Sequence, residues 1–432
     1  MKGSVAPTPH LRRAGIITTI ASLGAIALAT LLPEPGVARG THFCLLCGSL
    51  GGVSSILNVV LFIPLGVGLA LMGVAARRTI MVTLAVSSSI EVIQLLAIHG
   101  RYATVSDVIT NTLGGALGYA LVSFAGKLLR PGRRDARNLL LGWSAIWLAF
   151  QAVSAFGFAI ELTNFAYYGQ LARVVGNSVM FEGRVMSATI GGLPVPNTAL
   201  PDSRAVQRAL ENGALVEAKV TAATRARGTA PILRVADERN AEILLIAQKH
   251  NDLVFAVRTG ASIVRLRPPL FGLPDAFEDS ALTARAQPQS VLVLRARYDS
   301  GRVSIAAGTE RTSPQRTIRA SPSLSWTLLL PFQWVIEGTL TEKIVSLIWF
   351  ACLTAPLGFW YARTNPSLRS RRTMGEAGVS LLSGAALVLV GLAVIPRWMG
   401  LSVSALADWL ATSGGIALGY WAGTHVTHRR GD

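Results

Sequence analysis

Apolar runs dominate the pattern along the chain. Eight stretches carry at most one charged residue over roughly 20 positions, the length that a helix needs to cross the apolar layer of a bilayer. They are residues 14–32, 53–72, 79–98, 105–124, 139–160, 344–361, 378–395 and 403–421. We therefore predict a polytopic α-helical membrane protein with about eight transmembrane helices.

The pattern changes between the fifth and sixth apolar runs, at residues 161–343. Short apolar or alternating segments such as LVEAKVTAA, APILRVAD, VLVLRARY and RVSIAAG are separated by turn-rich DERN, HND and DSG. Short strands at this spacing predict an all-β sandwich, with Asp299–Gly301 as a tight hairpin. The following WTLLLPFQWVIEG is too short to span a bilayer, and its two tryptophans suit a segment at the membrane surface.

One stretch of this insert has a further resemblance. TAPILRVADERNAEILLIAQKHNDLVFAVRTG, at residues 229–260, resembles the concanavalin A-like, laminin G-like jelly rolls. The resemblance implies sugar binding, sometimes with calcium, but no loop of clustered Asp and Asn is present to hold that ion. A spacer or protein-contact domain is an equal alternative. The expected division is a transmembrane domain at 1–160, the β-sandwich at 161–343 and a second transmembrane domain at 344–432.

Composition and charge agree with a membrane protein. Hydrophobic residues make up 51% and charged residues 15% of the 432 residues, and mean hydropathy is +0.47. The net charge of +17 would suggest nucleic acid as the partner of a soluble protein. Here the basic residues cluster in short loops, 16 on the side of a cytoplasmic N-terminus against 3 on the other. We therefore expect no nucleic-acid partner, both termini in the cytoplasm of a bacterial cell, and the β-domain outside the inner membrane.

Six polar residues interrupt the second to fourth apolar runs and their outer loop. In this orientation all of them fall in the outer half of the membrane, where their side chains can converge on one outward-facing pocket. Glu91 and Gln94 are three residues apart and Asp107 and Asn111 are four apart, so each pair shares a helix face. The six residues are Asn58, Glu91, Gln94, Arg101, Asp107 and Asn111.

A carboxylate in lipid must be paired, protonated or hydrated, because burying its charge is costly. One interpretation is a structural ion pair in which Arg101 locks the loop through Glu91 or Asp107. The other is a ligand or proton site, which is the default hypothesis for ionisable groups inside a membrane.

Motifs at residues 58–118 follow one another in a fixed order. They are NVVLFIPLG at 58–66, the Glu-x-x-Gln of Glu91 and Gln94, Arg101, and D-x-x-x-N-x-x-G-x-x-x-G from Asp107 to Gly118. In this order they resemble the VanZ-like membrane family, over about residues 53–125. The resemblance implies a cell-envelope protein, with a founding member associated with glycopeptide antibiotic resistance and no established catalytic chemistry. Family members often have an acidic residue where this chain has Thr104, so any role that needs two carboxylates beside the arginine is in doubt.

The chain also contains an internal similarity. DVITNTLGGALGY at 107–119 aligns without gaps with DWLATSGGIALGY at 408–420. Gly114 and Gly118, like Gly415 and Gly419, form the small-xxx-small surface that lets helices approach closely. Residues 344–423 are therefore interpreted as a degenerate copy, with Phe350 for Asn58, Thr412 for Asn111 and no counterparts of Glu91 and Gln94. The alternative is chance similarity between two spans rich in Gly and Ala.

Familiar catalytic and metal-binding motifs are missing from the sequence. It has no P-loop, no G-x-S-x-G and no H-E-x-x-H, and we expect no cofactor and no metal site. Cys44 and Cys47 lie in the first outer loop, where a short-range disulfide is favoured over two inert thiols, and a metal site comes last.

Three function hypotheses follow from the polar cluster. The leading one is a non-enzymatic envelope protein that binds an anionic lipid head group or a lipid-linked glycan, with Arg101 on the phosphate and the β-sandwich capping the site. Its partners are then membrane lipids and, through the sandwich, a cell-wall precursor. The alternatives are an intramembrane enzyme with Glu91 or Asp107 as general base, and a transporter, although the two copies share one orientation and lack the inverted repeat of many transporters.

Overall fold

A computed structural model describes residues 8–32, 43–44, 51–98, 103–221, 223–278, 291–308, 315–364 and 374–425. The chain divides into two compact units, Met1–Leu139 and Leu140–Asp432. Each unit is considered by itself.

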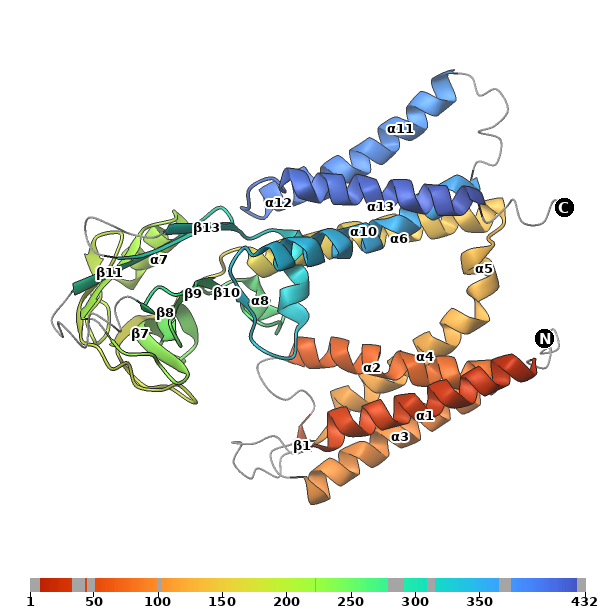
Figure 1. Ribbon diagram of the computed structural model, residues 1–432, viewed down its shortest axis with the longest axis horizontal. Helices are drawn as coiled ribbons and strands as arrows, with labels where there is room; N and C mark the ends of the chain where they lie inside the picture. The colour runs from red at the N-terminus through yellow and green to blue at the C-terminus, as the bar shows by residue number, and fades with distance from the viewer. Residues whose placement is uncertain are drawn as a thin grey trace. The chain divides into compact units, whose positions relative to one another are not determined.

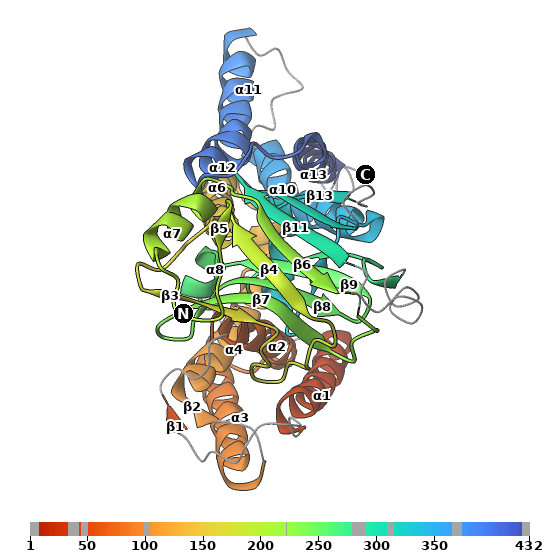
Figure 2. The ribbon, with the colours of Figure 1, turned by 90° about the vertical axis from the view of Figure 1, so that its left-hand side faces the viewer.

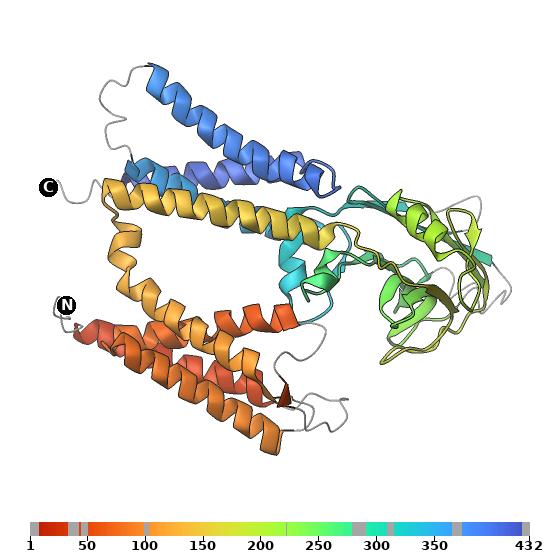
Figure 3. The ribbon, with the colours of Figure 1, turned by 180° about the vertical axis from the view of Figure 1, so that it is seen from behind.

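The first unit is a set of helices, red to orange in Figure 3, of which α1 to α4 lie side by side. They are α1 (Pro9–Leu31), α2 (Gly51–Leu71), α3 (Ala76–Ala97), α4 (Val105–Ser123) and the short α5 (Ala125–Leu129). Two short strands, β1 (Phe43–Cys44) and β2 (Ala103–Thr104), pair in parallel next to the start of α4.

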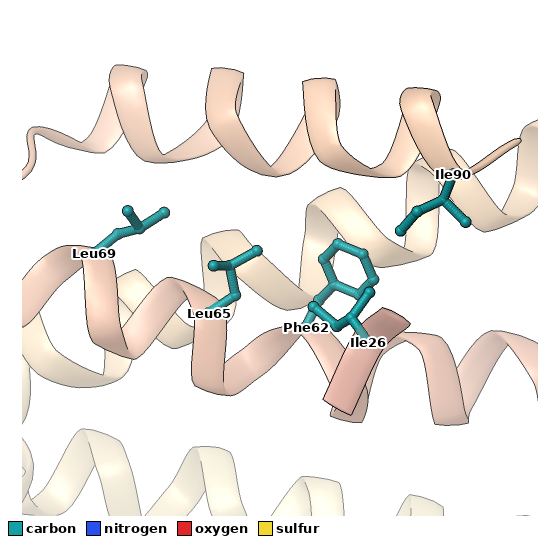
Figure 4. Packing of buried hydrophobic residues seen from close by; sticks show 5 residues of the cluster. All are labelled: Ile26, Phe62, Leu65, Leu69 and Ile90. Atoms are coloured by element: carbon teal, nitrogen blue, oxygen red, sulfur yellow. The ribbon is translucent and has the colours of Figure 1, made fainter. Parts of the chain in front are cut away.

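Apolar side chains from three helices form the core of this unit. Ile26 of α1, Phe62, Leu65 and Leu69 of α2, and Ile90 of α3 are each at most 6% exposed and pack together, as Figure 4 shows. Other large apolar side chains of the same helices, such as Ile20 and Leu96, face outward. A helix that is apolar on its outer face as well as its inner face is typical of a membrane span.

Glycines set the contact between α2 and α4. A Cβ added to Gly114 or Gly118 would overlap the carbonyl oxygen of Val59 or Ile63, respectively. On the other helix, a Cβ on Gly66 would overlap the carbonyl oxygen of Gly115. The two backbones therefore touch directly, which only glycine allows at these positions.

The helices of the second unit surround a second crossing of the same kind. They are α6 (Arg133–Phe158), which begins in the first unit, α10 (Leu340–Thr364), α11 (Met374–Leu389), the π-helix η3 (Val390–Val394), α12 (Ile395–Trp398) and α13 (Leu406–His425). In Figure 1, α6, α10 and α13 run side by side. A Cβ on Gly415 would overlap the carbonyl oxygen of Ala351, and one on Gly419 that of Ala355.

The two crossings use corresponding positions. Gly114 and Gly118 align with Gly415 and Gly419. Their carbonyl contacts in α2 are four residues apart, as are the contacts of the second pair in α10. The third contact recurs as well, because a Cβ on Gly358 would overlap the carbonyl oxygen of Ile416, as one on Gly66 would overlap that of Gly115.

All eight predicted spans form helices, but these helices differ in whether their length and hydropathy suffice to cross a bilayer. Five of the described helices are long and apolar enough to cross a bilayer, namely α1, α2, α3, α6 and α10. The spans predicted at 105–124 and 403–421 form α4 and α13, and the one at 378–395 forms α11 with η3. These three do not meet the same combined requirement of length and hydropathy, so the total of eight stays a prediction.

The predicted β-rich insert forms two sheets of six strands each. The strands of both sheets can be followed in Figure 2. One sheet has the order β14-β10-β9-β8-β7-β3 and the other β13-β12-β11-β6-β4-β5. The strands are β3 (Tyr167–Leu171), β4 (Val185–Ile190), β5 (Leu193–Pro194), β6 (Val216–Thr221), β7 (Thr229–Asp237), β8 (Glu242–Lys249), β9 (Asp252–Val257), β10 (Leu270–Leu273), β11 (Val291–Asp299), β12 (Arg302–Gly308), β13 (Gln315–Arg319) and β14 (Val335–Ile336).

The hairpin predicted at Asp299–Gly301 is confirmed. β11 and β12 are antiparallel, with Asp299 opposite Arg302. The two turn residues, Ser300 and Gly301, have φ of 50° and 78°, which is the backbone of a two-residue hairpin turn.

A dense set of hydrogen bonds joins the sandwich to the start of α10. The carboxylate of Glu342, 2% exposed, accepts from Trp334 Nε1 at 2.8 Å and from the backbone N–H groups of Gly338 and Thr339 at 2.6 and 3.0 Å. Trp326 Nε1 donates to Ser346 Oγ at 3.1 Å. The segment predicted to lie at the membrane surface thus forms the 3₁₀ helix η1 (Pro322–Leu329) and β14, and its depth in a bilayer stays a prediction.

Candidate polar site in the first helical unit

Helix α3 carries a stripe of polar side chains. Thr79, Thr83 and Ser87 are 0% exposed and Glu91 is 8% exposed, each four residues after the one before. This spacing places them on one helix face. Gly115 of α4 packs directly against Thr83, so the stripe faces α4 rather than the outside of the unit.

Glu91 accepts a hydrogen bond at the start of α4. Its Oε2 accepts from the backbone N–H of Thr104 at 2.7 Å. The Thr104 hydroxyl in turn accepts from the backbone N–H of Asp107 at 3.0 Å and caps α4. Asp107 is half-buried and close enough to Glu91 for electrostatic interaction. The structure therefore brings Glu91 and Asp107 together through Thr104, which bonds to both.

Asn111 has one satisfied and one unsatisfied amide atom. Its side chain is 3% exposed, and Nδ2 donates to Ser87 Oγ at 2.9 Å. Among the described residues, buried Oδ1 has no hydrogen-bond partner. A buried acceptor without a partner costs free energy, so it is a candidate point for binding a donor.

Gln94 and Asn58 are the two other predicted site residues that the structure describes. Gln94, 6% exposed, donates through Nε2 to the carbonyl oxygen of Thr30 at 2.9 Å and so ties α3 to α1. Asn58 is half-buried on α2, near the end of the second helical turn. Among the described residues, Gln94 thus bonds to α1, whereas Glu91 and Asn111 bond where α3 meets α4.

An apolar cleft of about 330 Å³ lies between α1 and α3. None of the predicted polar residues lines it, although Ile90 at its edge directly precedes Glu91. Its lining residues are Leu23, Ile26, Ala27, Leu31, Ala85, Val86, Ser89 and Ile90.

Two predictions fall on residues outside the described ranges. Arg101 is one of these residues, so its expected contact with Glu91 or Asp107 stays a prediction. The disulfide between Cys44 and Cys47 stays a prediction as well, because Cys47 and the side chain of Cys44 lie outside the description. Within the described residues, no three His, Cys, Asp or Glu side chains gather as a metal site requires.

Sequence reasoning missed the parts played by Ser87 and Thr104. The signal for Ser87 was available, because it stands four residues before Glu91. Thr104 was noted only as a departure from the family pattern. Its place three residues before Asp107 is the spacing of a helix N-cap, which marks it as the start of α4.

The β-sandwich also contains a charged cluster around a buried arginine, whose carboxylate partner is partly exposed. Arg234, 5% exposed, bonds to Glu242 Oε2 at 3.2 Å, Gln170 Oε1 at 2.8 Å and Asn240 Oδ1 at 3.0 Å. Burial raises the pKa of Glu242, and the neighbouring guanidinium of Arg234 lowers it in part. Every polar partner is within the cluster, so it serves to hold β3, β7 and β8 together.

The apolar helices and the two sheets define a membrane protein with an inserted β-sandwich. Comparison with known families adds a narrower similarity: residues 18–126 match the VanZ/LLP1 family. This match covers α2, α3 and α4 in full and most of α1, and it contains all six predicted polar residues. No curated protein and no solved structure matched the chain.

Proposed function

We propose that the first helical unit binds a lipid whose head group carries a phosphate and hydrogen-bond donors, such as an anionic phospholipid or a lipid-linked glycan. The observation that carries the proposal is the buried, unpartnered Oδ1 of Asn111 beside the bonded set of Glu91 and Thr104. In this proposal Arg101 meets the phosphate, because a guanidinium forms forked bonds to its oxygens. Asn111 Oδ1 accepts from a hydroxyl or ammonium group of the same head group.

The apolar cleft between α1 and α3 supports a lipid rather than a soluble anion. Its lining is aliphatic except for Ser89, and Ile90 of this lining directly precedes Glu91 in the chain. A hydrocarbon chain in this cleft would gain contact with the side chains while its head group reaches the polar residues.

The location follows from the distribution of basic residues. We infer that both termini face the cytoplasm and that the sandwich at residues 161–343 lies outside the inner membrane of a bacterial cell. Reporter fusions after Arg134 should give a cytoplasmic signal and fusions at Gly260 an external one. A cytoplasmic signal at Gly260 would overturn the placement. The family similarity supports a role in the cell envelope and, through resemblance, a link to glycopeptide resistance.

The second transmembrane part is proposed to be a degenerate copy of the first. Support comes from the recurrence of the three backbone contacts around Gly114, Gly118 and Gly66 at Gly415, Gly419 and Gly358. We further propose that the sandwich is a concanavalin A-like domain that contacts the glycan part of the ligand or a cell-wall precursor.

The proposal is tested by identifying the lipids that stay with the full chain through purification in mild detergent. We expect one class of phosphate-bearing lipid to be enriched over the membrane extract. Asn111→Leu and Glu91→Gln should lose the enrichment and stay folded, whereas Gln333→Leu in the sandwich should keep it. Equal lipid profiles for the protein and the membrane extract would contradict the proposal.

A further inference from the structure

The second unit contains a buried carboxylate at the position that aligns with Asp107. Asp408, 5% exposed, lies in the first turn of α13 and accepts from the backbone N–H of Ala405 at 3.2 Å. The hydroxyls of Ser321 and Ser323 also bond to it, and these two hydroxyls lie 2.7 Å apart. Arg319 attracts Asp408 electrostatically. Arg319 is exposed, so water screens its charge.

Gln151 of α6 is a second buried polar residue of the same unit. Its side chain is 0% exposed, and neither Nε2 nor Oε1 has a hydrogen-bond partner among the described residues. One turn earlier on the same face, Trp147 packs with Phe350 of α10 and Leu392 of η3. Towards the end of α6, Gly157 approaches Leu328 of η1. Gln151 is therefore enclosed where α6 passes between η1, α10 and η3.

Further unpartnered hydroxyls lie in η1, in α13 and in the loop before α13. Within the described part of the chain, Ser325 Oγ, Ser404 Oγ and Thr412 Oγ1 are buried and lack partners. Ser325 stands one 3₁₀ turn before Leu328, and Thr412 stands one α-turn after Asp408. The backbone N–H of Ser404 donates to the carbonyl oxygen of Leu392 at 3.0 Å, which places it against η3.

The helix next to Ser404 is itself irregular. η3 is a five-residue π-helix between α11 and α12. π-helical turns interrupt α-helices mostly at functional positions, because they release backbone groups from the regular ladder. Here one of these carbonyl groups, that of Leu392, bonds to Ser404 outside the helix.

We propose that Asp408, Gln151 and the surrounding serine hydroxyls form a site for one monovalent alkali cation. Carboxylate, amide and hydroxyl oxygens are the ligands that hard cations take. A single buried carboxylate balances one positive charge, whereas a divalent ion would leave a net charge in the interior. The site goes beyond the proposed lipid function, because its residues belong to the second unit and none of them was predicted from sequence to act.

Thermal unfolding of the full chain in detergent tests the site. The protein is purified in choline chloride, and choline is then replaced stepwise by sodium, potassium or lithium at constant ionic strength. We expect one alkali cation to raise the melting temperature by several degrees in a saturable way, because a ligand that binds only the folded state stabilises it. Gln151→Leu and Asp408→Asn should lose this rise, and Gln333→Leu should keep it.

The sign of the change in melting temperature caused by Gln151→Leu distinguishes a cation site from a buried amide that binds nothing. If the amide binds a cation, the leucine variant melts below the unmodified protein at saturating salt. If it binds nothing, removing two unpartnered polar atoms stabilises the protein in every salt, and the proposal is overturned. A rise given only by divalent ions, or an unchanged rise in Gln151→Leu, overturns it as well. Should Asp408→Asn fail to fold, Gln151→Leu alone decides.

Discussion

The helix pairs α2/α4 and α10/α13 have the same backbone contacts but different polar neighbours. In both pairs, glycines of the later helix rest on carbonyl groups of the earlier one, at corresponding positions. The polar partners of α4 come from α3, where Ser87 and Glu91 bond to Asn111 and Thr104. The partners of Asp408 come instead from η1. The two helix pairs thus share the same close packing, although different elements supply the polar groups around them.

The largest expected effect comes from breaking the shared packing. Gly118→Val and Gly419→Val each force a side chain into a backbone carbonyl, so we expect a loss of about 3 kcal/mol or more of stability. Melting temperature in detergent measures it. Gly414→Ala is the matched control beside Gly415, because an added Cβ there meets no atom within 4 Å. If Gly118→Val is harmless while Gly419→Val is not, the two crossings are not equivalent.

The next largest effect concerns the N-terminal end of α10, where the second pair differs from the first by its attached sandwich. Glu342→Ala leaves the N–H groups of Trp334, Gly338 and Thr339 without their acceptor, for an expected loss of about 3 kcal/mol. Glu342→Gln keeps one acceptor oxygen and should lose less. Limited proteolysis between η1 and α10 should become faster in the alanine variant. An unchanged rate of proteolysis would show that the hydrogen bonds of Glu342 do not hold the segment between η1 and α10 in place.

Much of this architecture was predictable because membrane helices and paired strands leave strong periodic signals. The hairpin at Asp299–Gly301 was predicted because turn-forming residues separate two segments of strand length. The edge strands β5 and β14 were missed because two residues each cannot show alternation. For the site, the proximity of Glu91 and Asp107 followed from helix depth. The hydrogen bond of Gln94 to α1 rather than α4 did not, because it depends on helix rotation, which sequence spacing alone leaves open.

A moderate effect is expected at the start of α4, where the first unit differs from the second. Glu91→Ala removes the acceptor of the Thr104 N–H, so we expect a loss of about 2 kcal/mol. Asp107→Asn should change stability less, because Asp107 is half-buried and its backbone bond to Thr104 remains. Chemical or thermal unfolding of both variants checks this order. An equal loss for the two would contradict the role assigned to Glu91.

The smallest effect concerns pH and the junction near β14. Burial and then the carboxylates of Asp252 and Glu342 raise the pKa of Glu337, while Arg316 opposes them. The folded protein therefore binds this proton more tightly than the unfolded chain, and the stability gained at low pH is lost as pH rises through the raised pKa. Glu337→Gln should flatten this dependence in a pH series of melting temperatures and slightly raise the value at neutral pH. An unchanged pH profile would contradict the assignment.

The most direct test of a lipid site confined to the first unit is photocrosslinking at two aligned positions. A photoreactive amino acid replaces either Ser106, next to Asp107, or Ala407, next to Asp408, in cells grown with radiolabelled phosphate. We predict a labelled lipid adduct at position 106 that is several-fold stronger than the adduct at position 407. The adduct at 106 should fall to the level of 407 when Asn111→Leu is added. Equal labelling at both positions would contradict the central claim, because it would reflect only the surrounding bilayer.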